Sequence, residues 1–114
     1  MTDNKGILVY AQITRNNEVL EVVNELCSEA QKLSAKLNGE KLEAVLLTNG
    51  QNLDNIKNSL EVFDKVYILK NEKFSKYSTD IYSKAVVDLI KEIKPSIFLI
   101  GATTQGRDLA PRIA

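Results

Sequence analysis

The sequence predicts an α/β fold in which a parallel sheet is covered by helices. Short apolar runs of strand length alternate with segments whose apolar residues recur every three or four positions, which gives the order β-α-β-α-β-α-β-α. The connections are short, as in β-α-β units with right-handed crossovers. The 114 residues are expected to form one domain over 1–114, a size that buries roughly two-thirds of the surface an unfolded chain exposes.

Composition argues against several classes of site. The 15 basic and 15 acidic residues cancel, so no net field favours nucleic acid or an anionic membrane. The chain has no histidine, the usual general base and metal ligand, and its single Cys27 excludes an internal disulfide or a cysteine cage. We therefore expect no metal site. No run reaches the length of a membrane span and the start lacks a signal-peptide core, which predicts a cytoplasmic protein.

The first strand and helix occupy the N-terminal third of the chain. Residues 7–13 are almost continuously apolar, which is typical of a strand buried on both faces. Either Asn16 or Asn17 is predicted to cap a helix over 18–37. Cys27 belongs to the apolar stripe of this helix, and nothing nearby would lower its pKa. We interpret it as a structural cysteine.

The middle of the chain repeats the pattern on a smaller scale. Residues 42–47 form the second strand and 66–69 the third. Between them, Asn52 or Asp54 is predicted to cap a short helix whose apolar side extends over 53–63.

A polar segment precedes the last predicted crossover helix. Residues 70–78 contain three lysines and are expected to form a solvated loop rather than a phosphate site. Ser78 or Thr79 is predicted to cap the following helix. Pro95 ends this helix, because the residue before a proline avoids helical angles.

The last stretch has the form of a strand, a turn and a helix. The apolar residues 97–100 form the fourth strand and lead into the turn 103–106. Thr104 or Asp108 is predicted to cap the final helix, with Pro111 in the first turn if Asp108 is the cap. Such strand-turn-helix units are where α/β proteins place ligands and partners.

The strand order 3-2-1-4 follows if the first three strands run to one side of the sheet. The first and fourth strands are the most apolar, so both are expected to be central. The order reverses between strands 1 and 4, and ligands of open α/β sheets gather at such a switch point. Here the crevice would be lined by 12–16 and 102–108.

The chemistry available at this turn suits binding better than catalysis. Two threonine hydroxyls, a glycine and two arginines suit an anion or a partner's carboxylate. No nucleophile–base pair can form, and neither G-x-G-x-x-G nor G-x-x-x-x-G-K-[ST] is present. Two interpretations of these residues stand side by side: a tight structural turn and a partner-binding surface. The residues expected to form the turn and a partner interface are Thr103, Thr104, Gln105, Gly106, Arg107, Asp108 and Arg112.

A family resemblance is carried by G-A-T-T-Q-G-R-D-L-A-P-R-I-A over 101–114. This segment resembles a conserved segment of the electron transfer flavoprotein α subunit. The runs I-L-V-Y-A and K-P-S-I-F-L-I-G-A fit the N-terminal domain of the same subunit. The resemblance implies a three-layer αβα domain of the adenine-nucleotide-hydrolase and universal-stress-protein type, truncated within its fourth helix.

The resemblance also implies a function. In that family the α subunit pairs with a β subunit and carries electrons from flavin dehydrogenases to a quinone reductase or another acceptor. FAD is held mainly by the C-terminal domain of the α subunit, so we expect no cofactor-binding residue in this fragment. The expectation is a scaffold and subunit-interface domain, not an enzyme. The alternative is an adenine-nucleotide-binding module. Because the fourth strand lies at a sheet edge, the fragment is also expected to self-associate.

Overall fold

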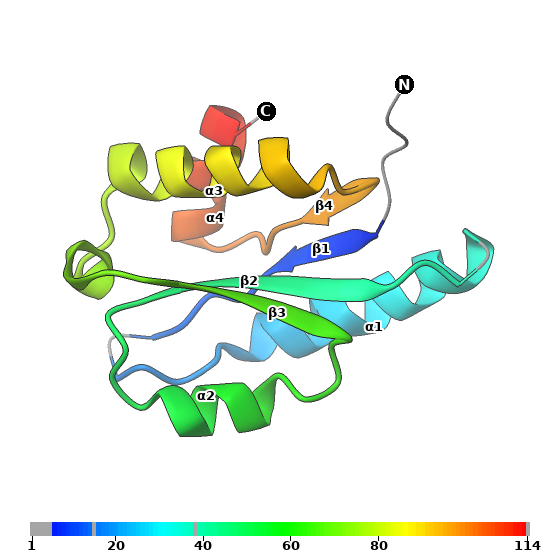
Figure 1. Ribbon diagram of the computed structural model, residues 1–114, viewed down its shortest axis with the longest axis horizontal. Helices are drawn as coiled ribbons and strands as arrows, with labels where there is room; N and C mark the ends of the chain where they lie inside the picture. The colour runs from blue at the N-terminus through cyan, green and yellow to red at the C-terminus, as the bar shows by residue number, and fades with distance from the viewer. Residues whose placement is uncertain (1–5, 15, 38, 114) are drawn as a thin grey trace.

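The computed structural model describes residues 6–14, 16–37 and 39–113. Its sheet has four parallel strands in the order β3-β2-β1-β4, as predicted (Figure 1). The strands are β1 (Ile7–Tyr10), β2 (Leu42–Thr48), β3 (Lys65–Lys70) and β4 (Ile97–Leu99). The apolar runs thus form the parallel sheet that their composition favours.

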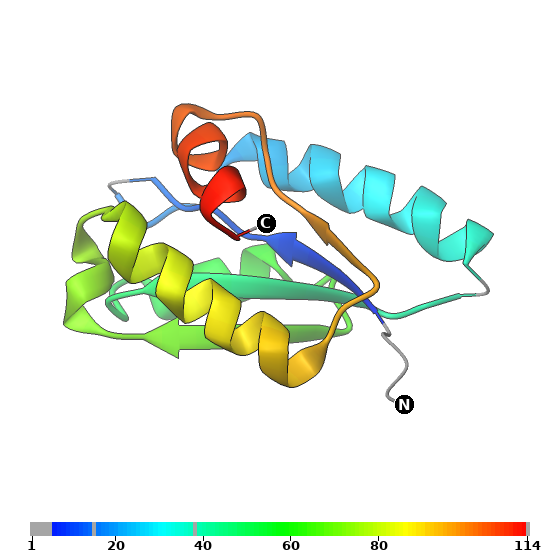
Figure 2. The ribbon, with the colours of Figure 1, turned by 90° about the horizontal axis from the view of Figure 1, so that it is seen from above.

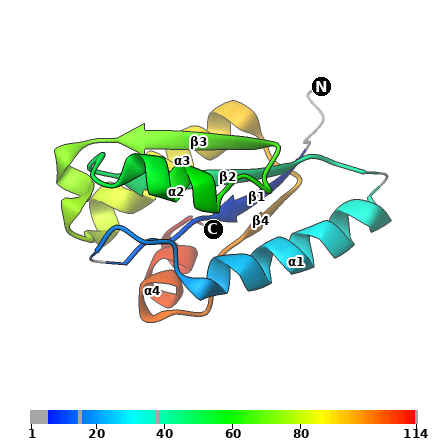
Figure 3. The same ribbon diagram turned by 90° about the horizontal axis from the view of Figure 1, so that it is seen from below.

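Helices cover both faces of the sheet, which confirms the layered arrangement. One face carries α1 (Glu21–Lys36) and α2 (Leu53–Ser59), and the other carries α3 (Thr79–Ile93) and α4 (Thr104–Ile113) (Figures 1, 2 and 3). A short 3-10 helix, η1 (Glu72–Ser75), lies between β3 and α3. None of the described helices is long and apolar enough to cross a membrane.

The two halves of the core meet at the central strand β1. Ile7 and Val9 pack with the α1 and α2 layer, whereas Leu8 and Tyr10 pack with the α3 and α4 layer. All four side chains are buried. The period of two along a strand explains why an unbroken apolar run is needed here. Cys27 is buried on the core side of α1, as predicted.

The segment between β1 and α1 differs from the prediction. The strand ends at Tyr10 rather than at Ile13, because the chain turns into an antiparallel bridge between Ile13 and Val19. The helix then begins at Glu21, with Leu20 at the N-cap position and no side-chain cap. The predicted caps at Asn16 and Asn17 are therefore wrong. Asn17 instead takes a left-handed conformation in the intervening turn (φ 58°).

The N-cap positions predicted for α2 and α3 are confirmed, but the side chains there do not form the expected cap hydrogen bonds. Asn52 precedes α2 with left-handed angles, and its Nδ2 donates to the backbone oxygen of Asn17 at 2.9 Å. Ser78 precedes α3, and its backbone oxygen, not its hydroxyl, accepts from the N–H of Tyr82 at 2.9 Å. Neither side chain makes a cap hydrogen bond. In both helices, backbone bonds close the first turn.

The lysine-rich segment 70–78 is not a simple solvated loop. Phe74 and Tyr77 turn inward and pack edge-on against Tyr82, with ring centroids 5.4 and 4.9 Å apart. Tyr82 Oη also donates to the backbone oxygen of Phe74 at 2.6 Å. The segment is thereby attached to α3 through aromatic contacts.

The C-terminal elements also differ in detail. β1 and β2 are central and β4 lies at the sheet edge with half-buried side chains, so the predicted order is confirmed, whereas the central position inferred from the apolar run of the fourth strand is wrong. Helix α4 begins at Thr104, which places Pro111 in its interior rather than in its first turn. Pro111 has no N–H to donate to the carbonyl of Arg107, four residues earlier.

Candidate functional site

The turn between β4 and α4 is closed by its own hydrogen bonds. Thr103 Oγ1 accepts from the N–H of Gly106 at 2.9 Å, which is the geometry of an N-cap. The same hydroxyl donates to Gln12 Oε1 at 2.7 Å. The cap of α4 is thus Thr103, not the predicted Thr104 or Asp108. It also attaches the turn to the segment after β1.

Gly106 is buried because the first turn of α4 packs on the backbone before it. A methyl group at Gly106 would overlap the carbonyl oxygen of Gly101 and lie 3.1 Å from the carbonyl carbon. Gly101 in turn faces α1, where a Cβ would lie 2.9 Å from Val22 Cγ2. The close approach that glycine allows here is to the chain itself and not to a ligand. Together with the Thr103–Gln12 bond, this packing joins the segments that follow β1 and β4 at the predicted switch point.

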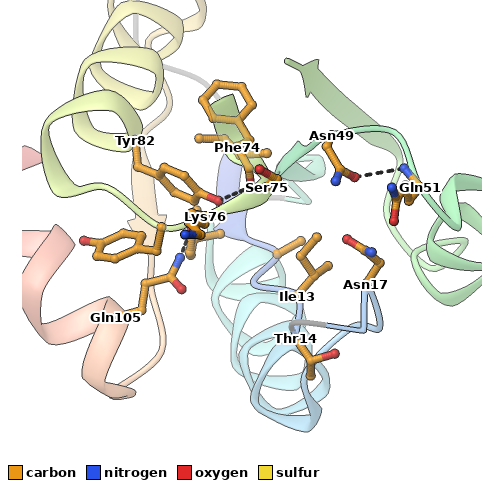
Figure 4. Close-up of a pocket in the computed structure, with 14 residues that line it drawn as sticks. Ile13, Thr14, Asn17, Asn49, Gln51, Phe74, Ser75, Lys76, Tyr82 and Gln105 are labelled. Carbon is orange, nitrogen blue, oxygen red and sulfur yellow. Dashed lines mark hydrogen bonds between the residues drawn. The ribbon is translucent and has the colours of Figure 1, made fainter. Parts of the chain in front are cut away.

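Gln105 points toward the sheet. Its Nε2 donates to the hydroxyl of Tyr10 at 2.6 Å (Figure 4). Burial, and secondarily the neighbouring Tyr82, raises the pKa of the Tyr10 phenol well above its usual value. Tyr10 therefore stays neutral and serves as an internal acceptor.

Asp108 and Arg112 connect α4 to the start of α3. Asp108 Oδ2 accepts from the hydroxyls of Thr79 and of Tyr77, the latter at 2.8 Å. These two hydrogen bonds hold the pKa of the Asp108 carboxyl below its usual range. Arg112 Nη1 lies 3.2 Å from Asp80 Oδ1 at the protein surface. Both charged residues are thus engaged within the domain.

Thr104 and Arg107 are the two predicted interface residues that remain available. Both side chains are exposed on α4. Among the described residues, neither side chain has a hydrogen-bond or ion-pair partner. The structure thereby separates five predicted residues that make contacts within the domain from two that face outward.

A cleft of about 810 Å³ lies at the carboxyl ends of the strands (Figure 4). Of the predicted lining, Ile13, Thr14 and Gln105 contribute, and Arg15 lies outside the described residues. The cleft extends away from β4, toward the segment after β2 and toward η1. Sequence reasoning missed these walls, above all Phe74 and Tyr77. Their spacing of three among lysines was the available signal of an inward face.

The described residues offer little for catalysis. They contain no group of three or more His, Cys, Asp or Glu that could hold a metal ion. Cys27 is buried on the core side of α1, and burial raises the pKa of its thiol, which disfavours the nucleophilic thiolate. The described residues can bind a ligand or a partner, but they contain no activated nucleophile.

The sequence of this chain is similar to that of a known protein family. Residues 7–114 match the family model described as "Electron transfer flavoprotein domain". The chain belongs to the electron transfer flavoprotein family. The match covers every helix and strand described above, and it confirms the resemblance that residues 101–114 carry.

Three curated relatives illustrate this membership in the electron transfer flavoprotein family. The chain is 44% identical to an electron transfer flavoprotein subunit alpha of Thermoanaerobacterium thermosaccharolyticum over 100% of its own length and 34% of the relative's. The corresponding protein of Clostridium acetobutylicum is 43% identical over 98% of the chain and 33% of the relative. The acryloyl-CoA reductase electron transfer subunit beta of Anaerotignum propionicum is 38% identical over 96% of the chain and 29% of the relative. The chain therefore spans about a third of these relatives.

Proposed function

We propose that this chain is the N-terminal domain of an electron transfer flavoprotein α subunit and serves as its scaffold and subunit interface. The full subunit would pair with a β subunit and carry electrons from flavin dehydrogenases to a quinone reductase or another acceptor. The family match over residues 7–114 is the observation that supports this most strongly.

FAD, the cofactor that the proposal implies, does not fit the two turns where a dinucleotide would be held. A pyrophosphate needs backbone N–H groups at a glycine turn that opens a helix. The turn after β1 contains no glycine, and Gly106 is packed against Gly101 without room for a methyl group. We therefore assign FAD to parts of the subunit outside this chain.

The outward face of α4 is the proposed contact surface. Thr104 and Arg107 are exposed there without a partner among the described residues, whereas Asp108 and Arg112 already bind within the domain. A guanidinium without an internal partner suits a carboxylate of the β subunit. The packing of Gly106 fixes the direction in which this face points.

Co-expression of the full-length subunit with its β partner tests the proposed function. The purified complex is expected to be yellow, with the absorption spectrum of a bound flavin. Colourless protein from a correctly assembled complex would contradict the electron-carrying role.

The interface is tested separately by reversing one charge. Arg107→Glu is expected to weaken the complex by at least about tenfold in Kd, because an attractive charge contact becomes repulsive. Lys91→Glu, on the exposed face of α3, is the matched control and should leave Kd unchanged. If the two variants bind the β subunit equally well, Arg107 is not at the interface.

The alternative of an adenine-nucleotide module at the switch point receives little support. The segments after β1 and β4 are joined by the Thr103–Gln12 hydrogen bond, and Gly106 packs on Gly101 rather than facing a ligand.

A further inference from the structure

A groove of about 420 Å³ lies between the outer strand β3 and α3. Its walls come from the C-terminal half of β3, from Phe74 of η1 and from one side of α3. β3 stands at an end of the sheet order and pairs with β2, and no other described strand lies against its outer edge (Figure 1). Such an edge offers backbone donors and acceptors to a further strand.

The ends of β3 carry lysines, which argue against a second copy of this chain at the edge. Lys65 and Lys70 are the first and last residues of the strand, and both are exposed. In an in-register antiparallel pair of two β3 strands, Lys65 of each copy would face Lys70 of the other. In a parallel pair each lysine would face its own counterpart. Like charges directly opposite destabilise strand pairing, so the edge suits a different protein.

The floor of the groove is apolar. It is formed by side chains that belong to the core on the α3 side of the sheet or pack against it, namely Leu69, Phe74, Ala85 and Leu89. Leu69, Phe74 and Ala85 are only half-buried, so part of their apolar surface is available to a partner. Ala85 projects no more than a methyl group, which leaves room for an apolar side chain from outside.

The α3 wall of the groove is acidic. Asp88 and Glu92 are exposed and lie one helical turn apart. Glu92 has no hydrogen-bond or ion-pair partner among the described residues, and Asp88 has an exposed ion pair with Lys84 at 3.5 Å. Lys70 also lines the groove, but its side chain lies against Gly50 and pairs with neither acid. Because like charges at this spacing repel, a cation from a partner would stabilise the wall.

The apolar and acidic parts of the groove lie at different levels along β3. Phe74 contacts Tyr82 near the start of α3, so the apolar part lies beside Leu69 at the C-terminal end of the strand. Burial and, to a smaller extent, the charge of Glu92 raise the pKa of the Tyr67 phenol, which places Glu92 nearer the middle of the strand. Leu69 and Tyr67 are two residues apart on one face, a separation of about 6.6–6.8 Å.

We propose that β3 accepts an extended segment of a partner protein as an additional strand. An apolar side chain of that segment enters the groove, and a lysine or arginine two residues away lies beside Glu92 and Asp88. The backbone edge supplies hydrogen bonds, whereas the apolar floor and the acidic wall select the sequence. The surface uses no residue of α4, so it does not rest on the contact proposed for the β subunit.

Fluorescence anisotropy of rhodamine-labelled peptides with the full-length protein tests the proposal. The peptides S-T-L-T-R-T-S and S-T-R-T-L-T-S place an apolar and a basic side chain on one face in the two chain directions. At least one of them is expected to bind with a Kd below about 1 mM. Serine in place of its leucine should weaken binding about tenfold, because the groove is then left unfilled. Lack of binding by both peptides would overturn the proposal.

Two charge reversals on the protein locate the contact. Glu92→Lys is expected to weaken binding of the tighter peptide about three- to tenfold, and glutamate in place of the peptide's arginine should restore the affinity. Glu25→Lys is the matched control and should leave Kd unchanged, because Glu25 is exposed on α1, which covers the opposite face of the sheet. Both substitutions are at exposed positions, so the fold should persist. Equal affinities of the two variants would contradict the assigned contact.

Amide hydrogen exchange distinguishes strand addition from docking of side chains alone. The bound peptide should slow exchange of the β3 amides and leave those of β4, at the opposite edge of the sheet, unchanged. Binding without slower exchange in β3 would refute the added strand.

Discussion

Replacing Gly106 with alanine tests how closely α4 packs on the turn before it. The new methyl group would overlap the carbonyl oxygen of Gly101 and lie 3.2 Å from Thr103 Oγ1. Because a backbone carbonyl cannot rotate away, α4 must shift. Over-packing of this kind costs about 1–3 kcal/mol. The shift also strains the cap hydrogen bond, at about 1 kcal/mol, which offsets the roughly 1 kcal/mol that alanine gains over glycine in a helix. We expect a net loss of about 1–3 kcal/mol in the free energy of unfolding.

Urea unfolding followed by far-UV circular dichroism measures this loss. Arg107→Ala is the control, since it adds no bulk and changes an exposed side chain of the same helix. Its free energy of unfolding should stay within about 0.5 kcal/mol of the wild type. If Gly106→Ala is as stable as the wild type or more stable, helix propensity dominates and the close packing of α4 is refuted.

Three further predictions follow from the contacts. Tyr10→Phe removes the acceptor of Gln105 and should cost about 1 kcal/mol at neutral pH. Because the pKa of Tyr10 is raised in the folded state, its contribution is complete below about pH 10 and declines above it. In urea titrations, the free energy of unfolding should therefore fall less above pH 10 in Tyr10→Phe than in the wild type. An equal fall in both proteins would contradict the assignment. Asp108→Asn should destabilise the domain at pH 7 but not below about pH 3, since a lowered pKa gives stability that is lost as pH falls. Asp88→Asn, at an exposed ion pair, is the control and should show little change in thermal unfolding at either pH. The edge strand β4 should make the isolated chain associate with rising concentration and bind an apolar dye, whereas a clean monomer by sedimentation would contradict this.

Much of the fold was predictable because each strand carries its own signal. An apolar run without polar interruption, as in Ile7 to Tyr10, can only be satisfied by burial on both faces. The stripe on α1 and the one on α3 likewise specify helices with one buried face. Parallel pairing follows from crossover connections of this length, and the order 3-2-1-4 follows if the first three strands run to one side of the sheet.

The local errors have a common origin. Asn16 and Asn17 have the chemistry of caps, yet the bridge between Ile13 and Val19 carries the chain past them before α1 begins. In the segment 70–78, the lysines predicted a solvated loop, whereas contacts of Phe74 with Tyr82 decided its course. Propensity describes a residue's preference in isolation, and packing against distant residues overrides it.

The sequence by itself determined the α/β class, the strand order and, through residues 101–114, the family. Only the tertiary structure decided what the residues of the last turn do. Thr103 bonds Gln12 across 91 positions, Gln105 bonds Tyr10 across 95, and Asp108 bonds Tyr77 across 31. Such pairs depend on where α4 comes to rest on the sheet, and no local pattern encodes that position. The same packing brings the start of α4 against the backbone of Gly101, because Gly106 has no side chain, whereas the cleft beside η1 is lined by the bulkier side chains of Phe74, Tyr77 and Tyr82.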